Sequence, residues 1–161
     1  MSELRDVADR FLKACARRGI LVATAESCTG GMIMSTLTDI PGSSSMVDRG
    51  FVTYSNEAKM DMVGVASATL DAHGAVSRET ALEMAAGALR HSRAGIALSV
   101  TGIAGPDGGS VEKPVGLVWF GVALAGIAPT AESRVFENRG RDFVRRESVR
   151  TALELGLARL A

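Results

Sequence analysis

The sequence predicts an α/β protein: a three-layer α/β/α sandwich around a mixed, mostly parallel sheet of about five strands. Three observations lead to this class. Apolar runs typical of buried strands alternate with amphipathic helical segments through the first two thirds of the chain. Several strands then follow with no helix between them, which requires at least one antiparallel pair. The 161 residues, 47% of them hydrophobic, fit a single domain spanning 1–161.

Helices and strands alternate before the long glycine-rich loop. In chain order we expect a helix over 2–18, a strand over 20–25, a helix over 30–40, a strand over 49–55, a short helix capped by Asn56 and a helix capped by Ser77. The first helix rests on apolar residues at helical spacing and on Gly19, which ends it. Asparagine and serine are favoured caps because their side chains accept hydrogen bonds from free helix N–H groups.

The last third of the chain predicts three strands and a final helix. The expected strands cover 95–102, 117–124 and 132–137, with the glycine-rich loop 102–116 after the first of them. Asp142 is expected to cap the last helix, whose buried stripe includes Val149, Leu153 and Leu160. These strands give the sheet its expected antiparallel part.

Composition excludes several classes of protein. The formal net charge is zero, so a nucleic-acid partner held by overall charge is not expected. The amino-terminal residues are charged and lack the apolar stretch of a signal peptide, and no apolar run is long enough to span a membrane. The two cysteines do not suggest a disulfide framework. We therefore expect a cytoplasmic protein with no membrane partner.

The segment ATAESCTGG, residues 23–31, places two nucleophiles where a strand becomes a helix. Ligands of open α/β sheets lie beyond the carboxyl ends of the strands. Gly30 and Gly31 permit a tight turn, and the N–H groups at the helix start favour an anion. Ser27 is thus a candidate nucleophile, with Thr29 and the two glycines in contact with substrate. The alternative is a helix cap beside an ordinary turn.

A serine nucleophile requires a base. Lys59 follows the second strand at the same expected sheet edge, and burial can lower a lysine pKa from about 10.4 toward neutrality. Tyr54 ends the same strand and is either a core residue or a proton relay. The alternative for Lys59 is a solvated side chain on a short helix. His73 and His91 have no evident carboxylate partner, so a Ser–His–Asp triad is weakly supported.

Other motifs are absent or open to two interpretations. The sequence contains no P-loop, no Gly-x-Gly-x-x-Gly motif and no Ser-x-x-Lys motif after Ser27, and its histidines and cysteines lack metal-ligand spacing. No metal and no cofactor are therefore expected. Thr101, Gly102 and Gly105 form a second glycine-bearing loop at a strand end, which we expect to face the same pocket. Of the arginines clustered at the start of the last helix, Arg141 is best placed to bind a phosphate.

Several ordered segments together resemble one family. They are TAESCTGG at 24–31, GFVTYSNEAK at 50–59, HGAVS at 73–77, TGIAGPDGGSVEKPVG at 101–116 and GRDFVRR at 140–146. They are similar to the CinA C-terminal-domain family, the stand-alone nicotinamide-nucleotide amidases. The resemblance covers nearly the whole chain. It implies hydrolysis of the carboxamide of nicotinamide mononucleotide, a three-layer α/β/α fold, a homodimer and no metal.

The resemblance also implies roles for individual residues. Ser27 would be the nucleophile, Lys59 the general base and Tyr54 a supporting proton-relay group. The other residues expected to bind substrate by this resemblance are Thr101 with its adjacent backbone, Ser44 and Arg141. The oxyanion of the tetrahedral intermediate would accept N–H hydrogen bonds from the loop and the start of the following helix.

Two rival interpretations remain open at this stage. Cys28 can replace Ser27 as the nucleophile, because thiols at helix N-termini are readily activated. Alternatively, the chain is a non-catalytic nucleotide-binding or regulatory module. A binder needs the glycine loops but not both Ser27 and Lys59.

Overall fold

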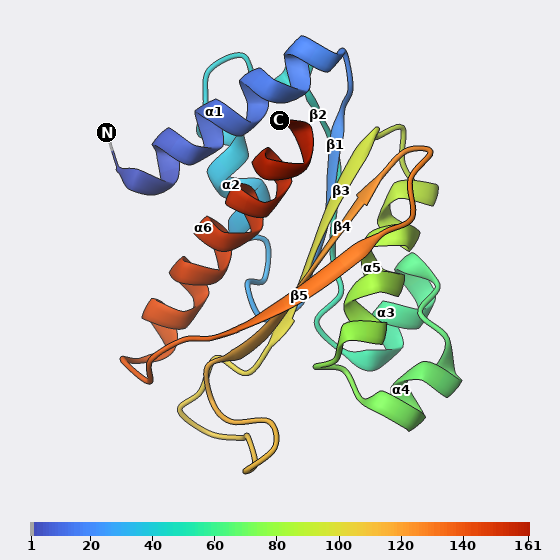
Figure 1. The fold of residues 1–161 in the computed structure, drawn as a ribbon, viewed down its shortest axis with the longest axis vertical. Coiled ribbons are helices and arrows are strands. Elements are labelled where there is room, and N and C mark those ends of the chain that lie inside the picture. The colour runs from blue at the N-terminus through green and yellow to red at the C-terminus, as the bar shows by residue number, and fades with distance from the viewer. Residues whose placement is uncertain (1) are drawn as a thin grey trace.

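A five-stranded mixed sheet separates two layers of helices (Figure 1). The computed structural model describes residues 2–161. Its strands, in the spatial order β2-β1-β3-β4-β5, are β1 (Val22–Glu26), β2 (Val47–Val52), β3 (Ile96–Gly102), β4 (Leu117–Leu124) and β5 (Thr130–Val135). β2, β1 and β3 are parallel, whereas β4 pairs antiparallel with both β3 and β5. The predicted fold class is confirmed.

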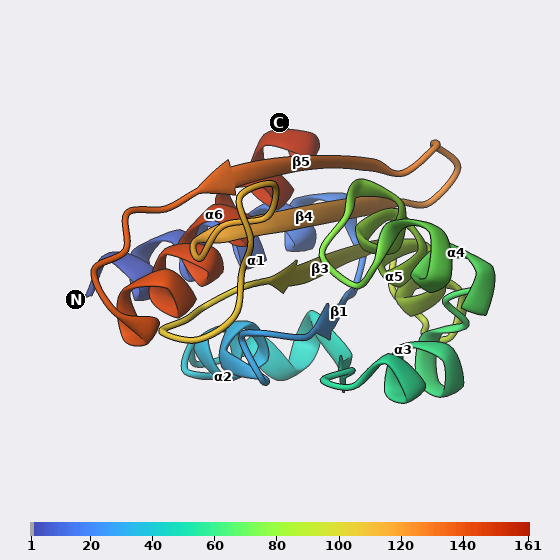
Figure 2. The same ribbon diagram turned by 90° about the horizontal axis from the view of Figure 1, so that it is seen from below.

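The helices divide between the two faces of the sheet (Figures 1 and 2). One layer contains α1 (Glu3–Arg18), α2 (Met32–Thr38) and α6 (Arg141–Leu160), and the other contains α3 (Asn56–Val63), α4 (Ser67–His73) and α5 (Arg78–Arg90). A short 3₁₀ turn, η1 (Ser43–Ser45), precedes β2. None of the helices in the described part of the chain is both long and apolar enough to cross a membrane.

Each layer has its own hydrophobic core. Between the sheet and α1, α2 and α6, large side chains such as Phe11, Leu98 and Leu153 are fully buried. Between the sheet and α5, the core is built largely from alanines with Met84. These small residues let α5 approach the sheet closely.

The structure corrects three details of the predicted elements. Ser55 rather than Asn56 caps α3, because its Oγ accepts a hydrogen bond from the N–H of Ala58 at 3.0 Å. Gly140 occupies the cap position of α6, and Asp142 lies in the first turn. The chain between α3 and Ser77, for which no helix was predicted, contains α4. Ser77 does cap α5, as predicted.

Candidate active site

The carboxyl ends of three parallel strands bring the predicted nucleophile between two threonines. Glu26, the last residue of β1, pairs with residues of both β2 and β3. The residues after these pairs, Ser27, Thr53 and Thr101, therefore lie next to one another at this edge, onto which Figure 2 looks. The N–H of Ser27 donates to the carbonyl of Val100 at 2.9 Å, which extends the sheet by one residue.

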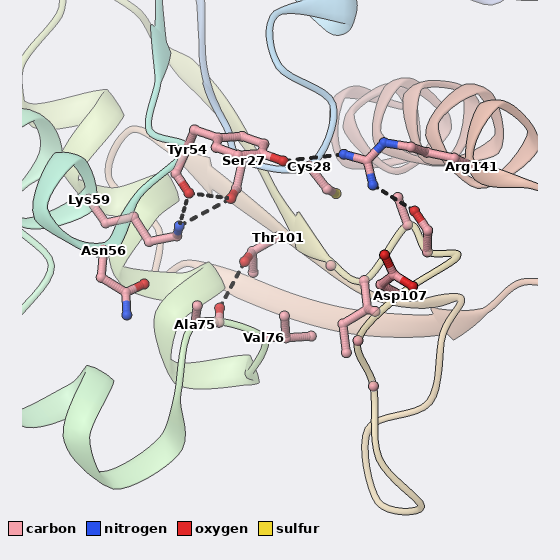
Figure 3. A pocket seen from close by; sticks show the side chains of 16 residues that line it. Ser27, Cys28, Tyr54, Asn56, Lys59, Ala75, Val76, Thr101, Asp107 and Arg141 are labelled. Atoms are coloured by element: carbon pink, nitrogen blue, oxygen red, sulfur yellow. Dashed lines mark hydrogen bonds between the residues drawn. The ribbon is translucent and has the colours of Figure 1, made fainter.

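An open pocket of about 360 Å³ lies at this edge (Figure 3). Five segments supply its walls: the residues after β1, the stretch from the end of β2 into α3, the segment before α5, the end of β3 with the loop after it, and the start of α6. The lining residues are Ser27, Cys28, Tyr54, Asn56, Lys59, Ala75, Val76, Thr101, Gly102, Ile103, Ala104, Gly105, Asp107, Gly108, Gly109 and Arg141.

Ser27 and Lys59 are in hydrogen-bond contact. The Oγ of Ser27 and the Nζ of Lys59 are 3.1 Å apart. The same Nζ donates to the carbonyl oxygens of Thr53 at 3.0 Å and Tyr54 at 3.2 Å. In this arrangement Nζ also donates to the Oγ of Ser27 and, at 3.5 Å, to the carbonyl of Ser55. A neutral amine has two N–H groups and one lone pair. After loss of one proton from the ammonium, the lone pair of Nζ can face this Oγ and accept the hydroxyl proton of Ser27.

Lys59 is buried, with 1% of its surface exposed. Burial lowers the pKa of its ammonium, because removal from water disfavours the charged form, while Cys28 and Glu57 act in the opposite direction. No carboxylate forms an ion pair with Lys59 among residues 2–161. A buried amine with a lowered pKa is chemically able to accept a proton, and the alternative of a solvated surface lysine is wrong.

Tyr54 contributes two different groups to the site. Its carbonyl oxygen accepts hydrogen bonds from Lys59 and, at 3.4 Å, from the hydroxyl of Ser27. Its side chain is 61% exposed, and the phenol oxygen accepts from Nη2 of Arg141 at 3.2 Å. Figure 3 shows the ring extending past Ser27 toward the start of α6. The phenol is therefore directed to Arg141 rather than to the Ser27–Lys59 pair.

Arg141 links the start of α6 to the glycine-rich loop. Its Nη1 donates to the carbonyl of Gly105 at 2.7 Å, while its Nη2 reaches Tyr54. Asp107 lies in the same part of the pocket (Figure 3). The guanidinium has five N–H groups, so the two contacts leave donors for a ligand.

Glu26 occupies the N-terminus of α2. This carboxylate is 1% exposed and accepts hydrogen bonds from the N–H groups of Ile33 at 2.8 Å and Met34 at 3.1 Å. It also accepts from the hydroxyl of Thr29 at 2.7 Å. The expectation that the start of this helix holds an oxyanion is therefore wrong, because an internal anion already fills that position.

The predicted substrate-binding residues divide into two groups. Thr101, Gly102, Gly105 and Arg141 line the pocket, but Thr29, Gly30, Gly31 and Ser44 do not. The side chain of Thr29 turns inward to Glu26, and the two glycines shape the turn behind Ser27. Ser44 lies in η1 before β2, at the opposite edge of the sheet. The pocket of this chain therefore excludes these four residues.

Thr101 helps to shape the floor of the pocket. Its hydroxyl donates to the carbonyl of Ala75 at 2.8 Å and so ties the end of β3 to the segment before α5. Asn56 and Asp107 line the pocket, although neither was among the predicted site residues. A polar residue directly after a strand or in a glycine-rich loop is the signal that could have identified them.

Cys28 lies in the pocket beside Ser27, but its thiol is a poor nucleophile. Burial raises the pKa of this thiol to about 11, so it is protonated near neutral pH. His73 and His91 do not line the pocket. Within the described residues, no group of three or more His, Cys, Asp or Glu side chains is placed to hold a metal ion.

Comparisons with known proteins give consistent matches. Residues 4–160 match the CinA C-terminal domain. A nicotinamide-nucleotide amidohydrolase PncC of Escherichia coli strain K12 is 52% identical over 153 residues, covering 95% of this chain and 92% of that protein. Among solved structures, competence/damage inducible protein CihA from Agrobacterium tumefaciens has a TM-score of 0.95 at 51% identity, covering 99% of this chain and 96% of that one. A competence-damaged protein (CinA) superfamily protein from Klebsiella pneumoniae 700603 has a TM-score of 0.93 at 33% identity, with coverage of 99% and 98%.

Proposed function

The chain belongs to the CinA C-terminal domain family, as its motifs predict, and on this premise we propose that it is a nicotinamide-nucleotide amidase. It hydrolyses the carboxamide of nicotinamide mononucleotide to the carboxylic acid and ammonia. The observation that carries the proposal is the 3.1 Å contact between the Ser27 hydroxyl and the buried amine of Lys59, inside the open pocket at the carboxyl ends of the parallel strands. The name of the Escherichia coli relative supports the same substrate class.

In the first half of the reaction, Ser27 Oγ attacks the carboxamide carbon while its proton moves to the neutral amine of Lys59. The C=O π pair becomes an oxyanion on the tetrahedral intermediate. The intermediate then collapses: the C–N bond breaks, and Lys59 returns the proton to the departing nitrogen, which leaves as ammonia. This order gives an acyl-enzyme on Ser27 and regenerates neutral Lys59.

In the second half, water attacks the acyl carbon and gives its proton to Lys59. Collapse of the second tetrahedral intermediate breaks the bond to Ser27 Oγ, which takes the proton back from Lys59. The product is the carboxylic acid, which ionises at neutral pH. Only water is consumed, so the cycle needs no redox partner and no group beyond the residues named.

We assign the phosphate of the nucleotide to Arg141. Its guanidinium lies at the side of the pocket beyond the ring of Tyr54 (Figure 3). Its remaining N–H groups can donate to a ligand. A charge-assisted hydrogen bond contributes about 1.5–3 kcal/mol, roughly tenfold or more in substrate selection. The mononucleotide is therefore preferred to the riboside, which lacks the phosphate.

Three further features are proposed with the activity. The chain acts as one amidohydrolase domain over 1–161, as a homodimer, and in the cytoplasm. Each follows from the family resemblance or the composition. Sedimentation of the purified protein measures whether it is a dimer.

The experiment is an ammonia-release assay on the purified protein with nicotinamide mononucleotide, its riboside and free nicotinamide. The proposal expects release with the mononucleotide, less with the riboside and least with the free amide. In Arg141→Ala, the preference for the mononucleotide over the riboside should shrink, mainly through KM. Tight binding of the mononucleotide without ammonia release would instead identify a non-catalytic binding module.

A further inference from the structure

Arg145 contacts the turn that carries the candidate nucleophile. It lies one helical turn after Arg141 on α6, so the two guanidinium groups share a face of the helix. The Nε of Arg145 donates to the carbonyl oxygen of Cys28 at 3.1 Å, and Nη2 donates to that of Thr29 at 3.3 Å. One planar group thus holds two successive peptides, from a helix more than 100 residues away in the sequence.

These contacts fix the direction of the N–H groups in the turn. In a trans peptide, the carbonyl of one residue and the N–H of the next point in opposite directions. Because the Cys28 carbonyl is held toward α6, the N–H of Thr29 is turned away from α6. The next peptide is fixed at both ends, since the N–H of Gly30 donates to the carbonyl of Ser27 at 3.0 Å.

The turn does not hold this arrangement by steric constraints alone. Gly30 and Gly31 have φ values of +56° and +106°, in the region that glycine enters with little penalty. A neighbouring peptide can therefore rotate at small cost unless hydrogen bonds prevent it. Arg145 supplies the bonds on the α6 side, and Glu26 holds the Thr29 side chain on the other.

The remaining N–H groups of the turn are those an oxyanion can use. The N–H groups at the start of α2 are bound to Glu26. Of the two that directly follow the nucleophile, only that of Cys28 belongs to a residue that lines the pocket, and it donates to no backbone carbonyl in the described part of the chain. Thr29 is fully buried and does not line the pocket. Serine hydrolases commonly use the N–H that follows the nucleophile to bind the oxyanion.

We propose that Arg145 is a positioning residue that holds the Cys28–Thr29 peptide and so fixes the turn in which the N–H of Cys28, the residue after Ser27, binds the oxyanion formed during attack. This inference rests on the proposed amidase function. The positive charge of Arg145 also reaches the site. Burial raises the pKa of the neighbouring Cys28 thiol, and the charge of Arg145 acts against that increase. The same field favours a developing oxyanion.

The kinetic test compares Arg145→Ala with Arg146→Ala, a matched control because Arg146 is the exposed next residue on the same helix. Loss of one oxyanion donor lowers kcat by about 10²–10³-fold. We therefore expect kcat of Arg145→Ala to fall toward this range, with KM and the melting temperature little changed. Free guanidinium ion should partly restore kcat, and Arg145→Lys should be intermediate, because an ammonium cannot span both carbonyls. Arg146→Ala should behave as wild type.

A crystal structure of Arg145→Ala separates failure of this inference from failure of the proposed function. We expect the Cys28–Thr29 peptide to be rotated or disordered in it. Ammonia release by wild type together with an unchanged peptide, or with unchanged kcat in the variant, would overturn the role of Arg145. If wild type releases no ammonia, the proposed function fails and the peptide orientation alone decides this inference. If Arg145→Ala does not fold, Arg145→Gln is judged by the same two measurements.

Discussion

Lys59 combines two properties at the scale of a single residue. It is buried, which lowers the pKa of its ammonium, and its nitrogen contacts three carbonyls and the hydroxyl of Ser27. A lysine in bulk water is protonated at neutral pH and cannot accept a proton. The burial of Lys59 therefore favours the role of general base that we propose for it.

Lys59→Arg should be nearly inactive although it retains the positive charge, because a guanidinium is not deprotonated in proteins. In wild type, the rate should fall at low pH as Lys59 becomes protonated and rise as pH increases through its lowered pKa. Lys113→Arg is a suitable control, since Lys113 also donates to a carbonyl, that of His73, but does not line the pocket. Comparable activity in the Lys59 and Lys113 variants would show that Lys59 is not the base.

The proximity of two site residues could be predicted from the sequence, whereas the contacts of two others could not. Ser27 and Lys59 follow adjacent strands, and the carboxyl ends of parallel strands share an edge, so their proximity could be predicted. The hydrogen bonds of Glu26 and Arg145 depend on how α2 and α6 pack against the sheet. No local pattern encodes those contacts, and the interior role of Glu26 also overturned the expected anion site at α2.

At the scale of elements, the position of α3 decides where Lys59 lies. Gly87 on α5 has no side chain, and a Cβ built there would lie 1.8 Å from the carbonyl oxygen of Val63, the last residue of α3. The two helices can therefore approach only because this residue is glycine. Their close contact places the amine of Lys59 against Ser27.

Gly87→Ala should lower both stability and kcat. The added methyl meets backbone, so α3 must move, and overpacking of this kind usually costs about 1–3 kcal/mol. Gly156→Ala is the comparison, because its methyl would meet side chains of Phe11 and Leu98 on the other face of the sheet. Thermal unfolding and kcat measured on both variants check this. A Gly87→Ala protein with wild-type kcat would show that α3 does not set the position of the base.

Element boundaries were predicted less well than element types. The sequence offers Ser55 and Asn56 as adjacent cap residues, and only the geometry shows that Ser55 makes the hydrogen bond. Helix α4 was missed because none of its residues is buried, so it lacks the apolar stripe by which helices are recognised. Strongly periodic elements such as α1 and α5 were predicted correctly.

At the scale of the whole molecule, the candidate site is completed by α6, the last helix of the chain. The α6 helix begins after β5, at the end of the sheet order, yet its first two turns place Arg141 and Arg145 beside residues that follow β1 and β2. Alternating strands and helices predicted the sandwich, but the closing of the pocket by α6 depends on its packing against α1 and the sheet. The homodimer remains a prediction.

The most direct test of Ser27 as the nucleophile compares ammonia release from nicotinamide mononucleotide by wild type, Ser27→Ala and Cys28→Ala. The two altered residues are adjacent and line the same pocket, so each variant controls for the other. Ser27→Ala removes only the hydroxyl that contacts Lys59, and Cys28→Ala removes a thiol that is protonated near neutral pH. We predict that Ser27→Ala loses ammonia release while remaining folded and that Cys28→Ala retains it. Near-wild-type release by Ser27→Ala, above all with loss in Cys28→Ala, would contradict it.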